Sequence, residues 1–473
     1  MVTDFKLEAF SHNASNYPLK MRFKKFLPVS LAVLMVISIT IFLTSWSTKH
    51  ALNGGKRFSQ GFRKLVLGIA SAPNVVVDSI RLILTYGSPG GVSEKYIAYQ
   101  VNSSSARTNT GYALVSFVSS GGKSEVMLVN ISNKVQHPVL FWNSKSDEVN
   151  YSDSLKGSAA RRQASISSRN RVCHPYLSPD GFLTYIVPFN DIVSVDLKTG
   201  KEKWRVQGAF HHSIQLDSED NFWVCAAVDV DSHKSPSSRI RHVNNLFEDQ
   251  ALVKISKNGR ILQVLSVTDL LCKSGLEYLL YGIANPAVSF DPIHLNQVTP
   301  ILHDSGALRK GDLLVSLRNL STILLINPES GKIDWHSSGP WMNQHSVHPM
   351  DNSTICLLDN HSYAQAFGFG DCWLDSAWKT RLITHNIKTG VTSEVQFSNE
   401  GMGQLRIPVE GLVVPIGSNG WFFEDSQNGT IMIFRNKELI FKWSNKYSDG
   451  TVGITSWCRY LKESQTPDFL LKN

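Results

Sequence analysis

One type of turn occurs four times in this chain, and it constrains the fold more than any other feature. Each copy is a short polar turn between two β-type segments, and it carries a glycine at position 200, 259, 331 or 390. A glycine in such a hairpin supplies the positive φ that other residues disfavour. Separations of 59, 72 and 59 residues between these glycines are typical of a β-propeller with insertions between its strands.

The length of the patterned region predicts the number of units. The β-type pattern begins at about residue 95 and continues to the C-terminus, residue 473. At roughly 60 to 70 residues per unit, this region predicts an all-β, six-bladed β-propeller. A pair of β-sandwiches is the alternative. We expect the segment Val452–Leu461 to be the strand that closes the ring, and a helix only near Ser266–Leu280.

Composition and charge exclude several classes of protein. Of the 473 residues, 42% are hydrophobic and 18% are charged, which excludes a mainly disordered or collagen-like chain. The net charge of +8 is dispersed, with its densest parts at Lys20–Lys25 and Lys156–Arg171, which we interpret as solvated flanks. No element combines basic residues with stacking aromatic side chains, so we expect no nucleic-acid partner.

The N-terminal region predicts a membrane anchor. Residues 26–46 contain no charged side chain, and at 1.5 Å per residue such a helix spans about 30 Å, the thickness of the hydrocarbon layer. A cleaved signal peptide is the alternative, but Thr44-Ser45-Trp46-Ser47 is a poor cleavage site. The basic cluster before the segment places the N-terminus in the cytoplasm. We therefore expect a single-pass protein of the cell (inner) membrane with a periplasmic or other extracytoplasmic domain.

The domain organisation follows from these patterns. We predict a cytoplasmic tail at 1–25, a transmembrane signal anchor at 26–46, a helical stalk or linker at 47–94, and the propeller at 95–473. Within the linker, residues 59–87 have roughly helical spacing interrupted near Pro73. Packing of these short helices against the main domain is the alternative to a stalk.

The six cysteines form no C-x-x-C pair, so a zinc site is not expected. A disulfide between Cys356 and Cys372, which flank one loop, is one possibility in an oxidising compartment. Six buried free thiols are the other.

The candidates for chemistry lie in separate repeat units. They are the pair His211-His212, together with His294, Arg318 and His345. Each lies in a strand or turn, and loops and strand ends of a β scaffold commonly carry function. Convergence on one axis of a propeller would bring these side chains together. Three asparagines nearby, at 296, 343 and 360, are candidates for binding substrate or orienting the histidines, and turn capping is the alternative.

The motifs around these residues resemble those of the bacterial arylsulfate sulfotransferases. The matching segments are Asp291-Pro-Ile-His-Leu-Asn296, Gly311-Asp-Leu-Leu-Val-Ser-Leu-Arg-Asn-Leu-Ser321, Gly331-Lys-Ile-Asp-Trp335, Gly339-Pro-Trp-Met-Asn-Gln-His345 and Leu358-Asp-Asn360. The resemblance is strongest over residues 205–360 and extends over 170–460. It implies a six-bladed propeller outside the cytoplasmic membrane that moves a sulfuryl group from an aryl sulfate to a phenol, without a nucleotide donor or other cofactor.

The resemblance also implies roles for individual residues. His345 would be the nucleophile that becomes transiently sulfated, because an imidazole can attack sulfur and leave again. His294, Arg318 and His212 or His211 would bind the sulfate oxygens and stabilise their negative charge. The chain departs from the family pattern at Ser213, where an aspartate often follows the histidine pair.

Three other functions compete with this one. A non-enzymatic quinoprotein-like scaffold would have similar turns, but would not require Arg318 with inward histidines. Such a protein often has a lipid-anchoring cysteine after its apolar segment, whereas the first cysteine here is Cys173. A quinone-dependent dehydrogenase would need calcium-binding carboxylates, and residues 291–345 offer only four aspartates. An aryl sulfate hydrolase would use the same centre with water as the acceptor. The oligomeric state is not predicted.

Overall fold

The computed structural model describes most residues between 97 and 471. The described residues are 97–100, 111–119, 124–132, 136–142, 171–228, 249–281, 291–361, 379–398, 407, 409–447, 450 and 452–471. The chain divides into two compact units, residues 1–80 and 81–473, and all described residues belong to the second. The predicted tail, transmembrane anchor and stalk, residues 1–94, lie outside the described residues. Within the described ranges, no helix is long and apolar enough to cross a membrane.

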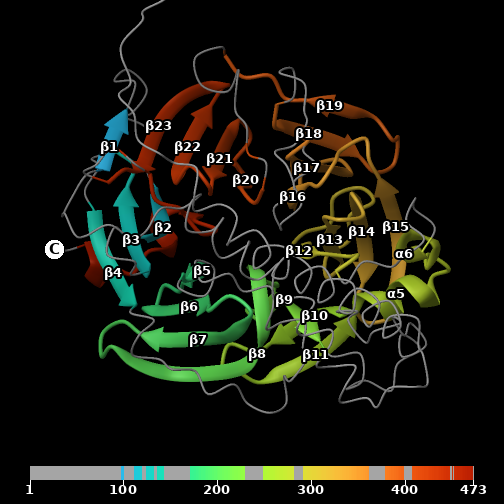
Figure 1. Ribbon diagram of the computed structural model, residues 1–473, viewed down its shortest axis with the longest axis horizontal. Helices are drawn as coiled ribbons and strands as arrows, with labels where there is room; N and C mark the ends of the chain where they lie inside the picture. The colour runs from blue at the N-terminus through green and yellow to red at the C-terminus, as the bar shows by residue number, and fades with distance from the viewer. Residues whose placement is uncertain are drawn as a thin grey trace, which may run out of the picture. The chain divides into compact units, whose positions relative to one another are not determined.

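The described residues of this unit form five antiparallel sheets that surround a common centre, in a propeller-like arrangement (Figure 1). Four of them have the size of a single blade. The first consists of β24 (Arg459–Leu461), β2 (Tyr112–Val118), β3 (Ser124–Asn130) and β4 (Gln136–Trp142). Another consists of β12 (Leu295–Pro300), β13 (Leu313–Leu317), β14 (Thr322–Asn327) and β15 (Lys332–Ser338). The next consists of β16 (His345–Pro349), β17 (Thr354–Asp359), β18 (Arg381–Asn386) and β19 (Thr392–Glu394). The last consists of β20 (Leu412–Ile416), β21 (Gly420–Asp425), β22 (Thr430–Arg435), β23 (Glu438–Asn445) and β1 (Ile97–Gln100).

The remaining sheet has seven strands. They are β5 (Cys173–Leu177), β6 (Phe182–Ile186), β7 (Asn190–Asp196), β8 (Lys201–Leu216), β9 (Phe222–Val228), β10 (Asp249–Ile255) and β11 (Ile261–Ser266). Strand β8 is 16 residues long. Its first part pairs with β7 and its second part with β9. The prediction of six separate blades is therefore wrong for strand pairing, because this continuous strand joins two units into one sheet.

Both ends of the described chain close the ring. The C-terminal strand β24 pairs with β2 near the start of the described residues. Strand β1 in turn pairs with β23 of the last sheet. The expectation that Val452–Leu461 is the closing strand is thus confirmed only for its last three residues, Arg459–Leu461, and each end of the described chain completes a sheet begun by the other.

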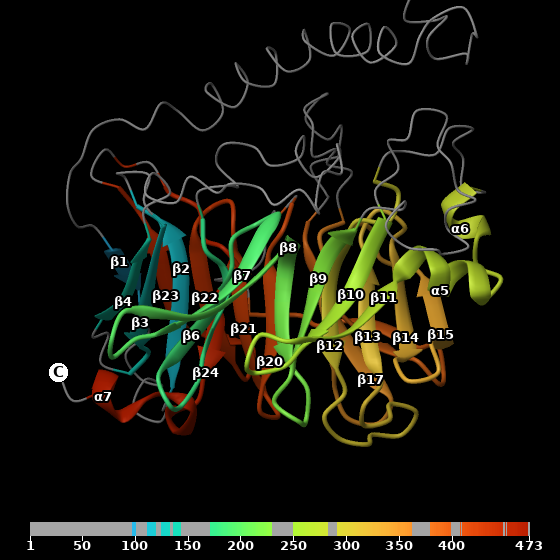
Figure 2. The same ribbon diagram turned by 90° about the horizontal axis from the view of Figure 1, so that it is seen from below.

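Burial explains the sequence of the central strands. Seen from the side, the strands run between the two faces of this unit (Figure 2). Each sheet packs against a neighbour on both sides, so central strands such as β13 (LLVSL) are buried throughout. The outer strand β15 (KIDWHSS) instead alternates between exposed and half-buried positions. Apolar side chains of neighbouring sheets form the core, for example Val315 and Leu324 against Leu252.

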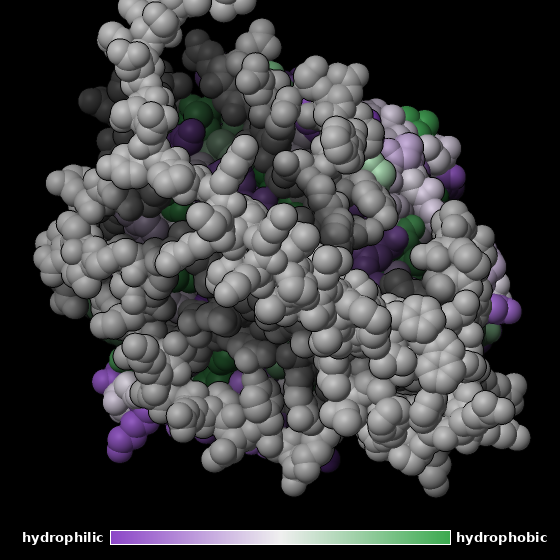
Figure 3. Space-filling view, viewed as in Figure 1, coloured by the Kyte–Doolittle hydropathy of each residue, from purple (hydrophilic) through white to green (hydrophobic). Residues whose placement is uncertain are grey.

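The predicted hairpin turns are confirmed. Gly200, Gly259, Gly331 and Gly390 all have positive φ, between 66° and 80°. The turn after β7 is at the rim, where residues 198–203 are exposed, and hydrophilic residues gather there on the face shown in Figure 3.

Helices are few in the described chain. The predicted segment Ser266–Leu280 forms α5 (Val267–Lys273) and α6 (Tyr278–Tyr281). The side chain of Ser266 caps α5 by accepting a hydrogen bond from the backbone of Asp269. Two short elements near the C-terminus, η5 (Glu463–Gln465) and α7 (Asp468–Leu471), were not expected.

Five cysteines are free thiols in the described chain: Cys173, Cys225, Cys356 and Cys458 are buried, and Cys272 is partly buried. Cys356 is a buried free thiol in the structure, so the disulfide with Cys372 is not formed, and Cys372 itself lies outside the described residues. Burial raises the pKa of the Cys356 thiol to about 12.

Candidate active site

The innermost strands of the ring are irregular where they approach its centre. Strands β5, β8, β12 and β16 each contain a register shift, within the pairs Cys173/Tyr176, His211/Ile214, Leu295/Gln297 and His345/His348. Residues in three of these bulges have a left-handed backbone, with φ of 47° at His174, 59° at His212 and 56° at Ser346. A bulge re-aims side chains relative to regular strand alternation. The side chains of polar residues in these strands therefore do not alternate between the two faces of the sheet as they would in a regular strand.

His345 begins β16 and is only 1% exposed. Its Nδ1 lies 2.7 Å from Oδ1 of Asn360. Its Nε2 is buried and makes no hydrogen bond within the described part of the chain. Burial holds the pKa of His345 well below its usual value, and the positive charge of Arg318 lowers it further. The imidazole is therefore neutral at neutral pH.

Asn360 determines which nitrogen of His345 carries the hydrogen. The Nδ2 group of Asn360 donates to the backbone carbonyls of Ile407 and Glu410, each at 2.8 Å. Because both amide hydrogens are used, Oδ1 faces His345 and can only accept a hydrogen bond. The hydrogen thus lies on Nδ1 of His345, and Nε2 carries the lone pair. Asn360 uses its whole amide within the protein, which fits an orienting residue better than the predicted substrate-binding one.

His294 lies immediately before β12 in a left-handed conformation, with φ of 50°. Its Nδ1 lies 2.5 Å from Oδ2 of Asp291, and its backbone N–H donates to Oδ1 of the same carboxylate at 2.9 Å. A carboxylate accepts hydrogen bonds, so Nδ1 carries the hydrogen and Nε2 is the atom that can exchange a proton or bind an oxygen. The side chain is 18% exposed, so it remains accessible.

The histidine pair on β8 is divided between two positions. The His212 ring packs edge-on against His294 and Trp457, with centroids 5.3 and 5.5 Å apart. The His211 ring stacks on Phe189 at 5.3 Å, and its Nδ1 lies 2.7 Å from Nδ1 of His212. His212 therefore lies with the other candidate residues, and the His211 side chain contacts His212. Burial lowers the pKa of His211 to about 3 and that of His212 well below its usual value.

Arg318 follows β13 and is 4% exposed. Its backbone N–H donates to the carbonyl of His294 at 3.0 Å, and one terminal nitrogen donates to Oδ1 of Asn319 at 2.8 Å. The charge of Arg318 lowers the pKa of His345, as stated above. The guanidinium group therefore acts electrostatically on the His345 ring, beside the backbone of His294.

The other two asparagines also lie in this region. Asn296 is fully buried, and its Nδ2 donates to the carbonyl of Gln344 at 2.8 Å, which positions the residue preceding His345. Its Oδ1 makes no hydrogen bond within the described chain. Asn343 has φ of 53°, and its backbone N–H donates to Oγ of Ser321 at 3.1 Å. The roles predicted for both residues in substrate binding stay predictions.

Trp457 is a central residue that sequence reasoning missed. Its ring is 5.5 Å from His212 and 6.1 Å from His345, and its φ is 57°. The buried carboxylate of Glu424 accepts hydrogen bonds from the backbone N–H groups of Trp457 and Cys458, at 2.9 and 2.5 Å. A glutamate within the apolar segment Trp421-Phe-Phe-Glu424 was the available signal, because buried carboxylates need partners.

Arg171 was also misinterpreted. Its segment was read as a solvated flank, but the Arg171 side chain is only 13% exposed and forms two hydrogen bonds to Glu410, at 2.5 and 3.1 Å. Its charge contributes to lowering the pKa of His212. Sequence offered no signal for this pair, because its members are 239 residues apart.

A second group of basic residues lies further along the same inner strands. It contains His174 on β5, His348 on β16 and Arg459 on β24. The charge of Arg459 lowers the pKa of both histidines, although burial is the larger cause. Among the described residues, no group of three or more histidine, cysteine, aspartate or glutamate side chains could hold a metal ion.

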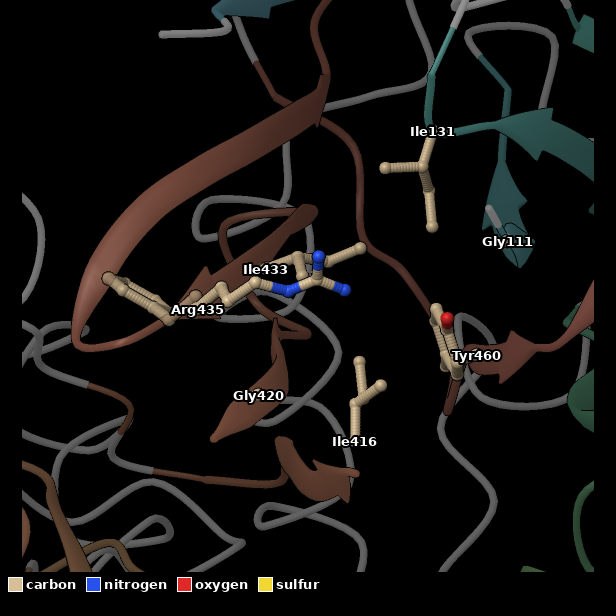
Figure 4. A pocket seen from close by; sticks show the side chains of 8 residues that line it. Gly111, Ile131, Ile416, Gly420, Ile433, Arg435 and Tyr460 are labelled. Atoms are coloured by element: carbon tan, nitrogen blue, oxygen red, sulfur yellow. The ribbon is translucent and has the colours of Figure 1, made fainter. Parts of the chain in front are cut away.

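A small groove lies elsewhere, between the last sheet and the first. Ile131, Ile416 and Ile433 line it together with Tyr460 and Arg435, whose guanidinium group extends toward Tyr460 (Figure 4). None of the described residues that line this groove is a histidine or another candidate residue, so it is distinct from the candidate active site.

Comparison with known families identifies the class of protein that this fold and site define. Residues 188–438 match the model of the family described as arylsulfotransferase (ASST). That match covers more than half of the chain and includes all the candidate residues from His211 to Asn360. The chain belongs to the arylsulfotransferase family.

Comparisons with curated proteins and with solved structures give no further assignment. No curated protein matches the chain. Among solved structures, it is similar to virginiamycin B lyase from Staphylococcus aureus, with 11% identity over 73% of this chain and 87% of that one, at a TM-score of 0.36. A chain of a nidogen/laminin complex has 10% identity over 75% and 99%, at 0.40. The chain covers 62% of the U3-55K structure, or 56% of its own length, at 6% identity and a TM-score of 0.33. At these TM-scores, the likenesses support no inference.

Proposed function

We propose that this protein transfers a sulfuryl group from an aryl sulfate ester to a phenol, through a sulfohistidine at Nε2 of His345 and without a nucleotide donor. One observation carries the proposal: Asn360 directs the hydrogen of His345 to Nδ1, so a neutral, buried Nε2 lone pair is available beside Arg318. Membership of the arylsulfotransferase family supports the reaction class.

The first step forms a bond between Nε2 of His345 and sulfur while the bond from sulfur to the aryl oxygen breaks. The electron pair of the broken bond leaves with the phenolate. In the second step, the oxygen of an acceptor phenol attacks sulfur, the bond from sulfur to nitrogen breaks, and the electron pair returns to Nε2. Splitting the transfer into two displacements is the usual advantage of a covalent intermediate.

His294 is suited to act as the general acid and general base. Its Nδ1 is held by Asp291, so its Nε2 would donate a proton to the departing phenolate and take one back from the acceptor phenol. The acceptor proton thereby restores the starting state, and no proton is gained or lost in a full cycle. The role requires that His294 be protonated before the first step, with the Asp291 carboxylate compensating its charge.

Arg318 and His212 would bind the sulfuryl oxygens, with His211 behind them. These oxygens carry negative charge throughout both steps, so fixed donors in a buried site stabilise the transition state. Arg318 supplies a permanent charge in this role, because a guanidinium group stays protonated.

The proposal extends to location. The apolar segment at 26–46 supports a single-pass membrane anchor, with the catalytic domain on the extracytoplasmic side.

The test uses the purified full-length protein with a chromogenic aryl sulfate, with and without added phenol. We expect phenol-dependent turnover, a mass increase of one sulfuryl group on the intact protein, and loss of both in His345→Gln. Release of the chromophore without an acceptor phenol would favour the hydrolase instead. A folded protein with neither turnover nor adduct across several aryl sulfates would contradict the proposal and favour the scaffold.

A further inference from the structure

The partly buried ion pair of Arg171 and Glu410 lies at the start of two inner strands. Arg171 precedes β5 and Glu410 precedes β20, so the pair connects sheets that are distant in sequence. Both guanidinium NH groups are engaged with the two carboxylate oxygens, the arrangement that fixes orientation best.

Glu410 has an unusual backbone. Its φ is 63°, in the left-handed region that is unfavourable for a residue with a side chain. Such a conformation persists only where the surroundings hold it. The side chain of Glu410 is held by Arg171, and its carbonyl oxygen is held by Nδ2 of Asn360 at 2.8 Å. The ion pair and the amide contact therefore act on the same residue.

The contacts continue to the nucleophile. Asn360 donates to the carbonyls of Glu410 and Ile407, and its Oδ1 accepts from Nδ1 of His345 at 2.7 Å. If the Glu410 carbonyl turned away, one hydrogen of the Asn360 side-chain amide would lose its acceptor, and this amide could rotate. Rotation would present Nδ2 to the ring, which favours the hydrogen on Nε2 and removes the lone pair there.

We propose that Arg171 and Glu410 are positioning residues that hold Asn360 and thereby fix the Nδ1–H tautomer of His345. This rests on the proposed function for its effect on catalysis, but the tautomer itself does not depend on that function. Neither residue contacts His345 directly, so the pair acts through Asn360.

The test combines kinetics with nitrogen NMR of full-length protein labelled at histidine. The His345 signals are identified by their absence in His345→Gln. In the wild type we expect one neutral tautomer with the hydrogen on Nδ1. In Arg171→Gln we expect a mixture of tautomers and a fall in kcat of about 10- to 100-fold with little change in KM, since small misplacements of reacting groups cost about this much. Arg171→Lys, which keeps the charge, should restore part of both.

A matched control removes another partly buried ion pair. Arg205 pairs with the buried Asp191 on β7 at 2.9 Å and with Glu202 at 2.7 Å, and in the described chain no hydrogen bond or ion pair joins Arg205 to a candidate residue. Arg205→Gln should lower Tm as Arg171→Gln does, without changing the His345 tautomer or kcat.

The outcomes separate the two proposals. A single Nδ1–H tautomer in Arg171→Gln, with only the loss of Tm seen in the control, would overturn the positioning role. Wild-type protein without any turnover would count against the sulfotransferase, while the NMR result would still decide the positioning role. If Arg171→Gln does not fold, Arg171→Lys and Glu410→Gln test the same prediction, because each weakens the paired hydrogen bonds.

Discussion

Two groups of basic side chains occupy the inner strands of this propeller-like unit, and they are used in different ways. In the candidate active site, Nε2 of His345 is buried without a hydrogen-bond partner in the described chain. In the second group, the backbone N–H of Ile214 donates to Nδ1 of His174 at 2.9 Å, and Nε2 of His348 lies 3.2 Å from Oγ of Ser346.

The arginines repeat this contrast. Arg459 donates to the carbonyls of Pro175 and Ile214 at 3.0 and 2.7 Å, and to Oε1 of Gln215 at 3.2 Å. It thus connects three inner strands. Arg318 donates to its chain neighbour Asn319 and contributes its charge beside His345. Residue type alone does not separate a reactive group from a structural one, because the hydrogen bonds that the fold supplies make the difference.

The sharpest test of this contrast compares two histidines on one strand. His345→Gln should reduce sulfuryl transfer by about 10³-fold or more, because it removes the nucleophile. His348→Gln, three residues along β16, should leave transfer within a few-fold of the wild type. Initial rates with an aryl sulfate and phenol measure both. Equal losses of activity in two folded variants would remove the distinction between the groups.

The arginine pair provides the next largest effect. Arg318→Gln should lower kcat by about 10²- to 10³-fold, the usual cost of losing one donor to a developing negative charge. Arg459→Gln should keep kcat but lower the free energy of unfolding by about 1–3 kcal/mol, because buried carbonyls lose their donor. Parallel kinetics and urea denaturation measure the two variants. A stable but inactive Arg459→Gln protein would contradict the structural role.

Acid should weaken the folded state through the second group. Burial lowers the pKa of His348 from 6.5 to about 3, so the unfolded chain binds a proton first as the pH falls below 6.5. Above pH 6.5, burial of the neutral His348 ring therefore costs the folded state nothing. Below that pH it lowers the free energy of unfolding, and this loss grows as the pH falls toward 3. At pH 5 it amounts to about 2 kcal/mol.

The variant His348→Gln isolates this effect. Its free energy of unfolding should fall by about 2 kcal/mol less than that of the wild type between pH 8 and pH 5. Urea denaturation at the two pH values measures the difference. An identical pH dependence in the two proteins would show that His348 is not buried in its neutral form.

Much of the architecture could be predicted from local pattern. The glycines of the hairpin turns have the expected positive φ because only that residue adopts it without cost. The closing strand was predicted from its position at the end of the series. The continuity of β8 was not, because a strand whose two parts pair with different neighbours has no mark in hydrophobic alternation.

In the candidate site, too, some residues could be predicted from local pattern and others only from tertiary contacts. His294, Arg318 and His345 could be chosen from sequence because they lie in motifs that resemble one family. Trp457 and Arg171 could not, because they enter the site through partners far away in the chain, Glu424 and Glu410.

The sequence by itself determined the β class of this protein, its repeated hairpins, its family and most of the side chains that could perform chemistry. These depend on local preference and on the order of residues. Only the tertiary structure decided which histidine nitrogens keep a lone pair, which of His211 and His212 lies with the other candidates, and which basic residues bind other parts of the chain. Hydrogen bonds between distant segments settle those questions, and each depends on where the folded backbone brings its donors and acceptors.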